Sequence, residues 1–134
     1  MTNEAAVLEQ LEPLGFERVV AESLSFADQV ALFASADVVI GPHGAGLANI
    51  VFCAPGTIVI ELNYETFRWT FPRVTSYAGL SDMFDLKYGL VLGNAVSSPW
   101  RSYKRTMPDR RDRISDFEVS PAAVIRVLDT LRSA

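Results

Sequence analysis

The sequence predicts a three-layer α/β domain with a mostly parallel sheet, and three observations support this. Asp37–Gly41 and Thr57–Leu62 are continuous apolar runs, which are typical of strands covered on both faces. Residues 41–55 between them leave room only for a tight turn, a short helix and a return loop, so the two strands form a parallel βαβ unit. Helical and strand patterns also alternate about every ten residues from residue 2 to residue 119. A doubly wound sheet follows.

Upstream of this unit, the sequence predicts a helix, a strand and a second helix. Thr2 or Asn3 can cap the first helix, which Gly15 ends and whose apolar face is Ala6, Val7, Leu11 and Leu14. Phe16–Ala21 is expected to form a short strand. Ser25 stands three residues before Asp28, a variant of the capping box, and so begins a helix that carries Phe26, Val30 and Phe33.

Downstream of the unit, three more elements are expected. Phe67–Gly79 has the pattern of an interrupted helix, and Asp85–Leu92 that of a strand. Pro121 fits the first turn of a terminal helix with Val124, Ile125 and Leu128 inward. Residues 1–134 therefore form one domain, in which residues 97–116 are expected to be a mobile loop.

Composition excludes several classes of protein. One Cys and one His rule out a disulfide within the chain and a structural zinc site. No apolar run reaches the 18 residues of a membrane span. The first twenty residues carry four Glu and no basic stretch of the kind that begins a signal peptide, so we expect a cytoplasmic location, with membrane association through an upstream anchor left open.

Charge is unevenly distributed along the chain. Residues 1–100 hold 4 basic and 11 acidic side chains, whereas residues 101–134 hold 8 and 5. Six of the basic residues lie between Arg101 and Arg113, which suits either an anionic partner or a solvated loop. Nucleic acid is a poor fit, since the rest of the molecule is acidic and no groove-reading motif is present.

A glycine-rich loop, Gly41-Pro42-His43-Gly44-Ala45-Gly46, joins a predicted buried strand to a helix start. Its glycines permit positive φ and close backbone approach, and the helix start offers unpaired N–H groups to an anion. His43 can add a hydrogen bond to a phosphate oxygen. The loop matches neither the P-loop nor the dinucleotide pattern, and the alternative is a tight turn whose glycines serve only packing.

Glu61 lies at the carboxyl end of the next predicted strand, where related sheets place the acidic residue that holds a ribose hydroxyl. The alternative is a solvated carboxylate at the end of a strand.

Ser25–Asn63 resembles the core of glycosyltransferase family 61, most specifically over Asp37–Leu62 with its His-Gly-Ala-Gly-Leu-x-Asn core. The resemblance extends over about residues 2–131. Family members transfer sugars such as xylose, arabinose or N-acetylglucosamine, and bacterial members are often called capsular polysaccharide biosynthesis proteins.

The resemblance implies an inverting two-domain GT-B transferase whose C-terminal, Rossmann-like half binds the nucleotide sugar, and this chain is similar to that half. Position by position, it implies that the diphosphate contacts His43, Gly44, Ala45 and Gly46. It also implies that the nucleoside is contacted by Ser25, Phe26, Gln29 and Glu61. No metal or other cofactor is expected, and the catalytic base is unknown, because in such enzymes it usually comes from the other domain.

Two departures from the family pattern shape the expected function. The resemblance places the start of the chain at the family's Asn-Glu, here Asn3-Glu4. We therefore expect this chain to lack the preceding strand, where members usually carry an Arg, and the N-terminal domain on the acceptor side. We expect the donor-binding part of a transferase for polysaccharide or capsule synthesis, inactive alone, that meets its glycan acceptor through the missing domain. The alternative is a non-catalytic nucleotide-binding or scaffolding module. An unpaired sheet edge would also favour homo-oligomers.

Overall fold

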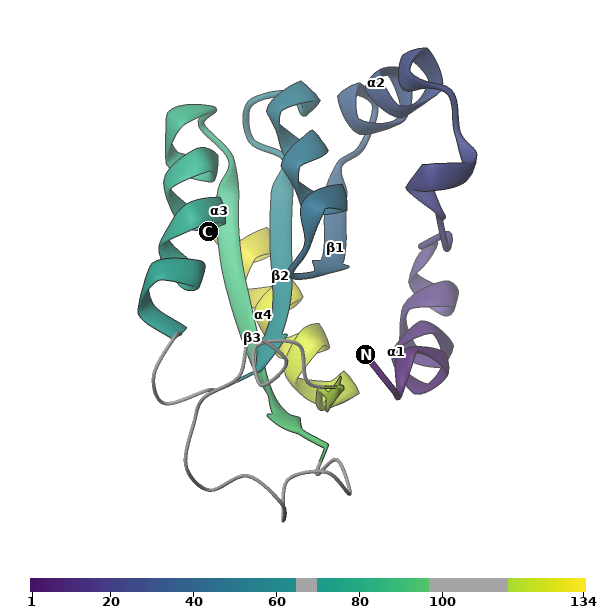
Figure 1. Cartoon of the computed structure of the whole chain (residues 1–134), viewed down its shortest axis with the longest axis vertical. Coiled ribbons are helices and arrows are strands. Elements are labelled where there is room, and N and C mark those ends of the chain that lie inside the picture. Colours follow the sequence, from purple (N-terminus) through teal and green to yellow (C-terminus); the bar gives the residue numbers. More distant parts are fainter. Residues whose placement is uncertain (65–69, 97–115) are drawn as a thin grey trace, which may run out of the picture.

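The centre of the computed structural model is a curled sheet of order β1-β2-β3-β4 (Figure 1). The model describes residues 1–64, 70–96 and 116–134, with only the backbone over 70–75. The strands are β1 (Val38–Pro42), β2 (Ile58–Tyr64), β3 (Lys87–Ala95) and β4 (Phe117–Glu118). β1, β2 and β3 are mutually parallel, and β4 pairs antiparallel to β3. The prediction of an α/β fold with a mostly parallel sheet is confirmed. The predicted doubly wound arrangement is not seen in the described strands, because their order does not reverse and the helices that follow β1 and β2 both lie on the same face.

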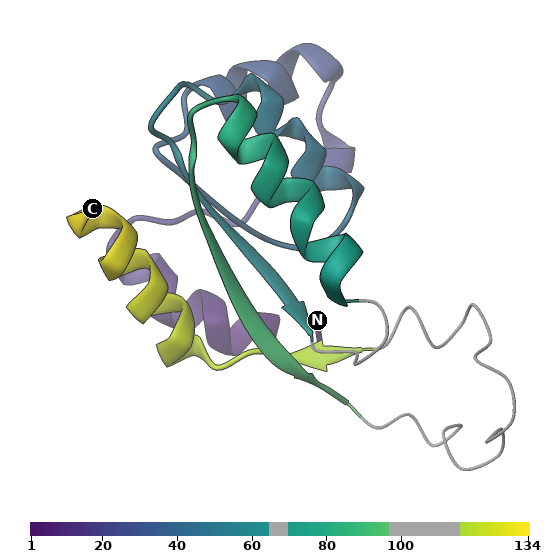
Figure 2. The same ribbon diagram turned by 90° about the vertical axis from the view of Figure 1, so that its left-hand side faces the viewer.

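Helices cover both faces of this sheet, as three layers require; Figure 2 shows α3 and α4 on opposite sides of β3. One face carries α1 (Glu4–Leu11) and α4 (Pro121–Ser133). The other carries α2 (Phe26–Ala34), the 3₁₀ helix η3 (Ala45–Phe52) and α3 (Thr70–Met83). Because side chains alternate along a strand, the central strand β2 supplies residues to both cores. Ile58, Ile60 and Leu62 pack toward α1 and α4, whereas Val59 packs toward η3.

The terminal helix α4 begins as predicted and packs closely on β3. Ser120 caps it by accepting the Ala123 N–H at 3.4 Å, and Pro121 occupies the first turn. Val124 and Leu128 are fully buried. A Cβ at Gly89 of β3 would lie 2.6 Å from Val127 Cγ1, so this glycine allows the helix to approach the sheet.

The predicted helix boundaries near the amino terminus are confirmed, with one difference in capping. Gly15, at φ 86°, ends the first helical segment, and Ser25 Oγ accepts the Asp28 N–H at 3.2 Å at the start of α2. Asn3 precedes α1, but its side chain bonds both main-chain groups of Val119 instead of the helix. The beginning of the chain is thereby tied to the segment before α4.

The predicted strand Phe16–Ala21 is wrong. Residues 16–20 have no regular structure, and a short 3₁₀ helix, η2 (Ala21–Ser23), follows them. A strand requires a partner for its main-chain groups. Here a cavity of about 900 Å³, lined both by residues 15–22 and by β1, occupies the space where a partner would lie. Among the described strands, β1 pairs with β2 alone and forms an edge of the sheet.

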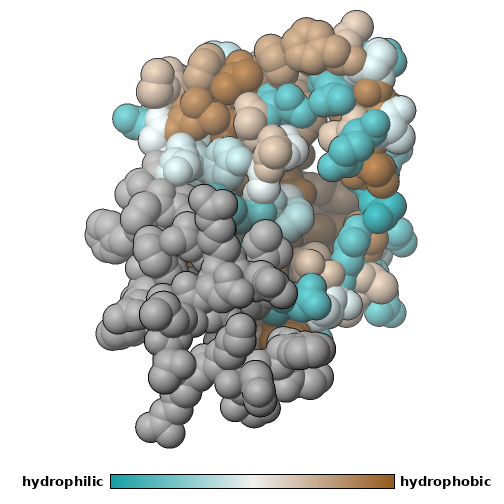
Figure 3. Space-filling view, in the orientation of Figure 1, coloured by the Kyte–Doolittle hydropathy of each residue, from teal (hydrophilic) through white to brown (hydrophobic). Residues whose placement is uncertain are grey.

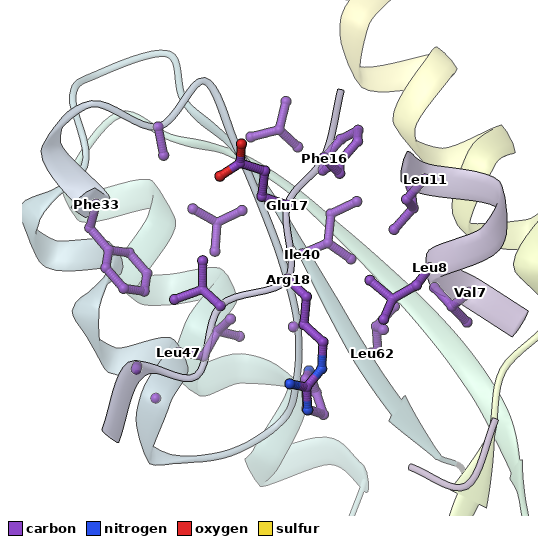
Figure 4. A pocket seen from close by; sticks show the side chains of 18 of the residues that line it. Val7, Leu8, Leu11, Phe16, Glu17, Arg18, Phe33, Ile40, Leu47 and Leu62 are labelled. Atoms are coloured by element: carbon purple, nitrogen blue, oxygen red, sulfur yellow. The ribbon is translucent and has the colours of Figure 1, made fainter. Parts of the chain in front are cut away.

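This cavity has a largely apolar lining drawn from both cores. Figure 3 shows the hollow, and Figure 4 shows its side chains from close by. Leu11 and Leu62 belong to the core under α1 and α4, whereas Phe33 and Leu47 belong to the other. The cavity therefore runs beside β1 through both layers, which explains why β1 is only half-buried while β2 is fully buried.

The remaining elements agree with prediction except at their ends. The helix predicted over Phe67–Gly79 is α3, which continues to Met83; residues 67–69 lie outside the described residues. The strand predicted from Asp85 begins at Lys87, since Asp85 adopts a left-handed φ of 56°. β4 was not predicted, because two residues show no period.

The predicted basic loop lies outside the described residues, apart from Asp116. In the described part of the chain, no helix has both the length and the apolar character needed to cross a membrane.

We predict opposite effects on stability for two Gly→Ala substitutions. At Gly93 a Cβ would lie 2.0 Å from the Glu118 carbonyl oxygen, so Gly93→Ala should destabilise the fold by about 2 kcal/mol or more. At Gly79, in the exposed part of α3, a Cβ meets nothing within 4 Å, and Gly79→Ala should stabilise by about 0.5–1 kcal/mol. Urea unfolding measures both. Equal midpoints for the two variants would contradict the pairing of β3 with β4.

Candidate functional site

The glycine-rich loop lies at the carboxyl edge of the parallel strands, as the sequence predicted. β1 ends at Pro42 and η3 begins at Ala45, so His43 and Gly44 form the link. The His43 N–H donates to the Leu62 carbonyl oxygen at 2.8 Å, which continues the pairing of β1 with β2 by one residue. Ligands of open α/β sheets bind at this edge.

The loop turns without left-handed glycines. Gly44 has φ 169°, which is ordinary extended backbone. The described glycines that adopt a left-handed φ are Gly15 and Gly56, and both lie outside the loop. Close approach is needed at Gly41, where a Cβ would lie 3.1 Å from Leu47 Cδ1. The predicted short helix is present as η3, of the tighter 3₁₀ type.

The start of η3 presents exposed main chain. Its first hydrogen bond runs from the Leu47 N–H to the Gly44 carbonyl oxygen at 3.0 Å. The N–H groups of Ala45 and Gly46 precede this bond, and both residues are exposed. These are the N–H groups that the start of a helix leaves without an intrahelical partner.

Glu61 is fully buried, so the alternative of a solvated carboxylate at the end of a strand is wrong. Its carboxylate accepts three hydrogen bonds. Oε1 lies 2.6 Å from His43 Nδ1 and accepts from Asn63 Nδ2 at 3.0 Å. Oε2 accepts from the Tyr88 hydroxyl at 2.6 Å. A carboxylate taken out of water requires such donors, and these come from the loop, from β2 and from β3.

Two tyrosines complete the surroundings of His43. The Tyr77 ring of α3 packs edge-on against the imidazole with centroids 5.3 Å apart, and its hydroxyl donates to the Gly44 carbonyl oxygen at 2.6 Å. The pKa of Tyr77 is raised mainly by burial and to a smaller extent by the charge of Glu61. The pKa of Tyr88 is raised more than that of Tyr77, by burial, by the hydrogen bond to Glu61 and by the charge of Glu61. Both phenols therefore stay protonated at neutral pH.

Sequence reasoning identified His43 and Glu61 but missed Asn63, Tyr77 and Tyr88. Asn63 could have been identified from the sequence, because side chains two residues apart on a strand point to the same face, as those of Glu61 and Asn63 do. The position of Tyr88 beside Glu61 depends on the register of the sheet, in which Tyr88 pairs with Val59. Tyr77 depends on how α3 packs.

The predicted nucleoside residues on α2 are not beside His43. Gln29 Oε1 accepts from Asn49 Nδ2 at 2.9 Å, in the middle of η3. Phe26 is exposed and packs edge-on against Phe52, with centroids 5.8 Å apart. Phe52 ends η3, about 14 Å along its axis from Ala45 at about 2 Å per residue. A nucleoside role for these residues and for Ser25 stays a prediction.

The cavity beside β1 reaches the loop, because its lining includes Pro42–Leu47 as well as Arg18 (Figure 4). Arg18 Nε donates to Glu4 Oε1 at 2.6 Å, and both side chains are about half exposed. In the described residues, no three His, Cys, Asp or Glu side chains gather as a metal site would require. The loop thus combines an imidazole held by Glu61 with two N–H groups that have no partner within η3.

We predict that Tyr88 makes stability fall at alkaline pH. Its pKa is raised in the folded state, so above about pH 10 the unfolded chain binds fewer protons than the native one. The contribution of Tyr88 to the free energy of unfolding is fully present below that pH, and it is lost as the pH rises toward the higher pKa of the folded state. Urea unfolding between about pH 8 and 11 should show this loss, and Tyr88→Phe should reduce it. An identical slope in both proteins would contradict the assignment.

Comparisons with known proteins point to one family. Residues 1–60 match the family model described as Glycosyltransferase 61. A beta-1,2-xylosyltransferase of Arabidopsis thaliana is 40% identical over 58 residues, which are 42% of this chain and 11% of that protein. An EGF domain-specific O-linked N-acetylglucosamine transferase of Drosophila melanogaster is 37% identical over 57 residues, again 42% of this chain and 11% of that protein.

The chain thus spans about a tenth of the length of these two relatives. The family match contains the loop and His43, and it ends one residue before Glu61. These findings support the glycosyltransferase 61 family for the amino-terminal part of this chain.

Proposed function

We propose that this chain binds a nucleotide sugar and serves as the donor-binding part of an inverting glycosyltransferase. The diphosphate would lie over the loop, contacted by His43 and by the exposed main chain of Ala45 and Gly46. The match of residues 1–60 to a glycosyltransferase family supports this, as do the two relatives named as sugar transferases.

The chemistry of transfer explains why such a loop is useful. When the anomeric bond breaks, the departing nucleoside diphosphate gains negative charge, and fixed donors that face this charge stabilise the transition state. A helix start with an imidazole beside it supplies such donors without a metal. The observation that carries the proposal is that His43, next to those exposed N–H groups, is held at 2.6 Å by a fully buried carboxylate.

The architecture fits the donor half of a GT-B enzyme. Such a half is Rossmann-like, and the parallel strands β1–β3 with a glycine-rich loop at their carboxyl edge support that assignment. The acceptor glycan and the catalytic base would then come from a second domain, in the same polypeptide or another. Synthesis of a surface polysaccharide, such as a capsule, is the process we propose.

We predict that His43→Ala weakens the binding of uridine or guanosine diphosphate by about 1–3 kcal/mol, the cost of a hydrogen bond to a charged group. A thermal-shift screen would first choose the nucleotide, because a ligand specific for the native state raises the melting temperature. Calorimetry then compares the wild type, His43→Ala and Arg126→Ala. Arg126 is exposed on α4, on the opposite side of the sheet, and controls for the loss of a cation. Equal affinities of the wild type and His43→Ala would remove His43 from the site.

Transfer requires a separate experiment. Alone, the chain should bind nucleotide without transferring sugar; joined to an acceptor-side domain, it should transfer sugar from one donor of a broad panel. Nucleotide binding without transfer from any donor would favour the alternative, a binding or scaffolding module that has lost the reaction.

A further inference from the structure

The pairing of Glu61 with His43 determines which nitrogen of the imidazole carries the proton. We infer that Glu61 is a positioning residue that keeps the proton of His43 on Nδ1, so that Nε2 can donate to a phosphate oxygen only when the ring is an imidazolium. A ring that is neutral before a nucleoside diphosphate binds must then take up one proton. The part that concerns diphosphate rests on the proposed function; the position of the proton does not.

The first step of the argument is the set of donors around Glu61. The Asn63 amide and the Tyr88 hydroxyl both donate to its carboxylate, which as an anion can only accept. The contact of 2.6 Å between Oε1 and Nδ1 therefore needs a hydrogen on Nδ1. Full burial leaves water no means of replacing that donor.

The second step concerns the other groups that face the ring. In the described residues, the titratable side chains packed against this pair are Tyr77 on α3 and Tyr88 on β3. The Tyr77 hydroxyl is directed to the Gly44 carbonyl oxygen and that of Tyr88 to Glu61. Both phenols stay neutral at physiological pH, so the charge that the imidazole meets is that of Glu61.

The third step is the state of Nε2. This nitrogen has no hydrogen-bond partner among the described residues, and the side chain is 22% exposed. In a neutral ring protonated on Nδ1, Nε2 carries a lone pair, which repels the lone pairs of an ionised phosphate oxygen. In the imidazolium both nitrogens donate, one to Glu61 and the other outward. The ring must therefore gain a proton before it can hold the anion.

Nuclear magnetic resonance can test the position of the proton without a ligand. His43 is the single histidine of the chain, so ¹⁵N-coupled spectra contain one imidazole. At alkaline pH the neutral ring should carry its proton on Nδ1 in the wild type and in Tyr88→Phe, which keeps the carboxylate. In Glu61→Gln the amide can donate to Nδ1, and the proton should move to Nε2. A wild-type ring protonated on Nε2, or the same tautomer in all three proteins, would overturn the inference.

Calorimetry tests the coupling to binding. Uridine diphosphate is titrated in two buffers of different ionisation enthalpy at about pH 8, where the phosphates, with a last pKa of about 6, are already ionised. At a pH where the ¹⁵N spectra show a neutral ring in the free protein, proton uptake by the wild type should approach one per ligand. In Glu61→Gln the neutral ring can donate from Nε2, so proton uptake should disappear. His43→Gln serves as the control and should show no uptake.

The outcomes separate the two hypotheses. Binding without uptake in the wild type, or equal uptake in the wild type and Glu61→Gln, would overturn the inference and leave the proposed function standing. If none of the proteins binds uridine diphosphate, both the proposed function and the proton uptake on binding are contradicted. The tautomer of His43 in the NMR spectra would still decide whether Glu61 positions the ring.

Discussion

The burial of the Glu61 carboxylate in the central strand is the constraint on which the site depends. A carboxylate removed from water is tolerated when donors surround it, and leaving a buried polar group without its hydrogen-bond partner costs about 1–3 kcal/mol, more for a charged group. The donors come from Asn63 on the same strand, Tyr88 on the neighbouring strand and His43 in the loop. Folding thus fixes the loop, because an alternative loop conformation would leave the carboxylate without one of its donors.

This requirement also explains why β2 has two different faces near its carboxyl end. Toward α1 and α4, Ile60 and Leu62 continue the apolar core. Toward η3 and α3, Val59 is followed by Glu61 and Asn63, so this face of the strand changes from apolar to polar beside the glycine-rich loop. An apolar residue at position 61 would remove the acceptor shared by Asn63 and Tyr88. The imidazole of His43 would then keep its edge-on contact with Tyr77 but lose the hydrogen bond that orients Nδ1.

Much of the fold could be predicted because local signals and packing agree. The apolar runs of β1 and β2, the Ser25 cap and Pro121 each set an element by a local rule. Phe16–Ala21 has the composition of a strand, yet strand formation depends on a neighbour that local sequence does not reveal. The same limit applies to the site, since His43 and its loop are visible as a motif whereas Tyr77 and Tyr88 depend on register and helix packing.

The edge position of β1 raises the question of what keeps the loop in place. β1 pairs on one side only, and the cavity lies along its other side. In the described residues, the hydrogen bonds of His43 and Gly44 come from β2, α3 and η3 and not from that open side. The Leu62 carbonyl oxygen accepts the His43 N–H, Glu61 holds the ring, and the Tyr77 hydroxyl bonds Gly44. These contacts from β2 and α3 fix His43 and Gly44, so the position of the loop is set by the interior of the sheet rather than by the cavity beside β1.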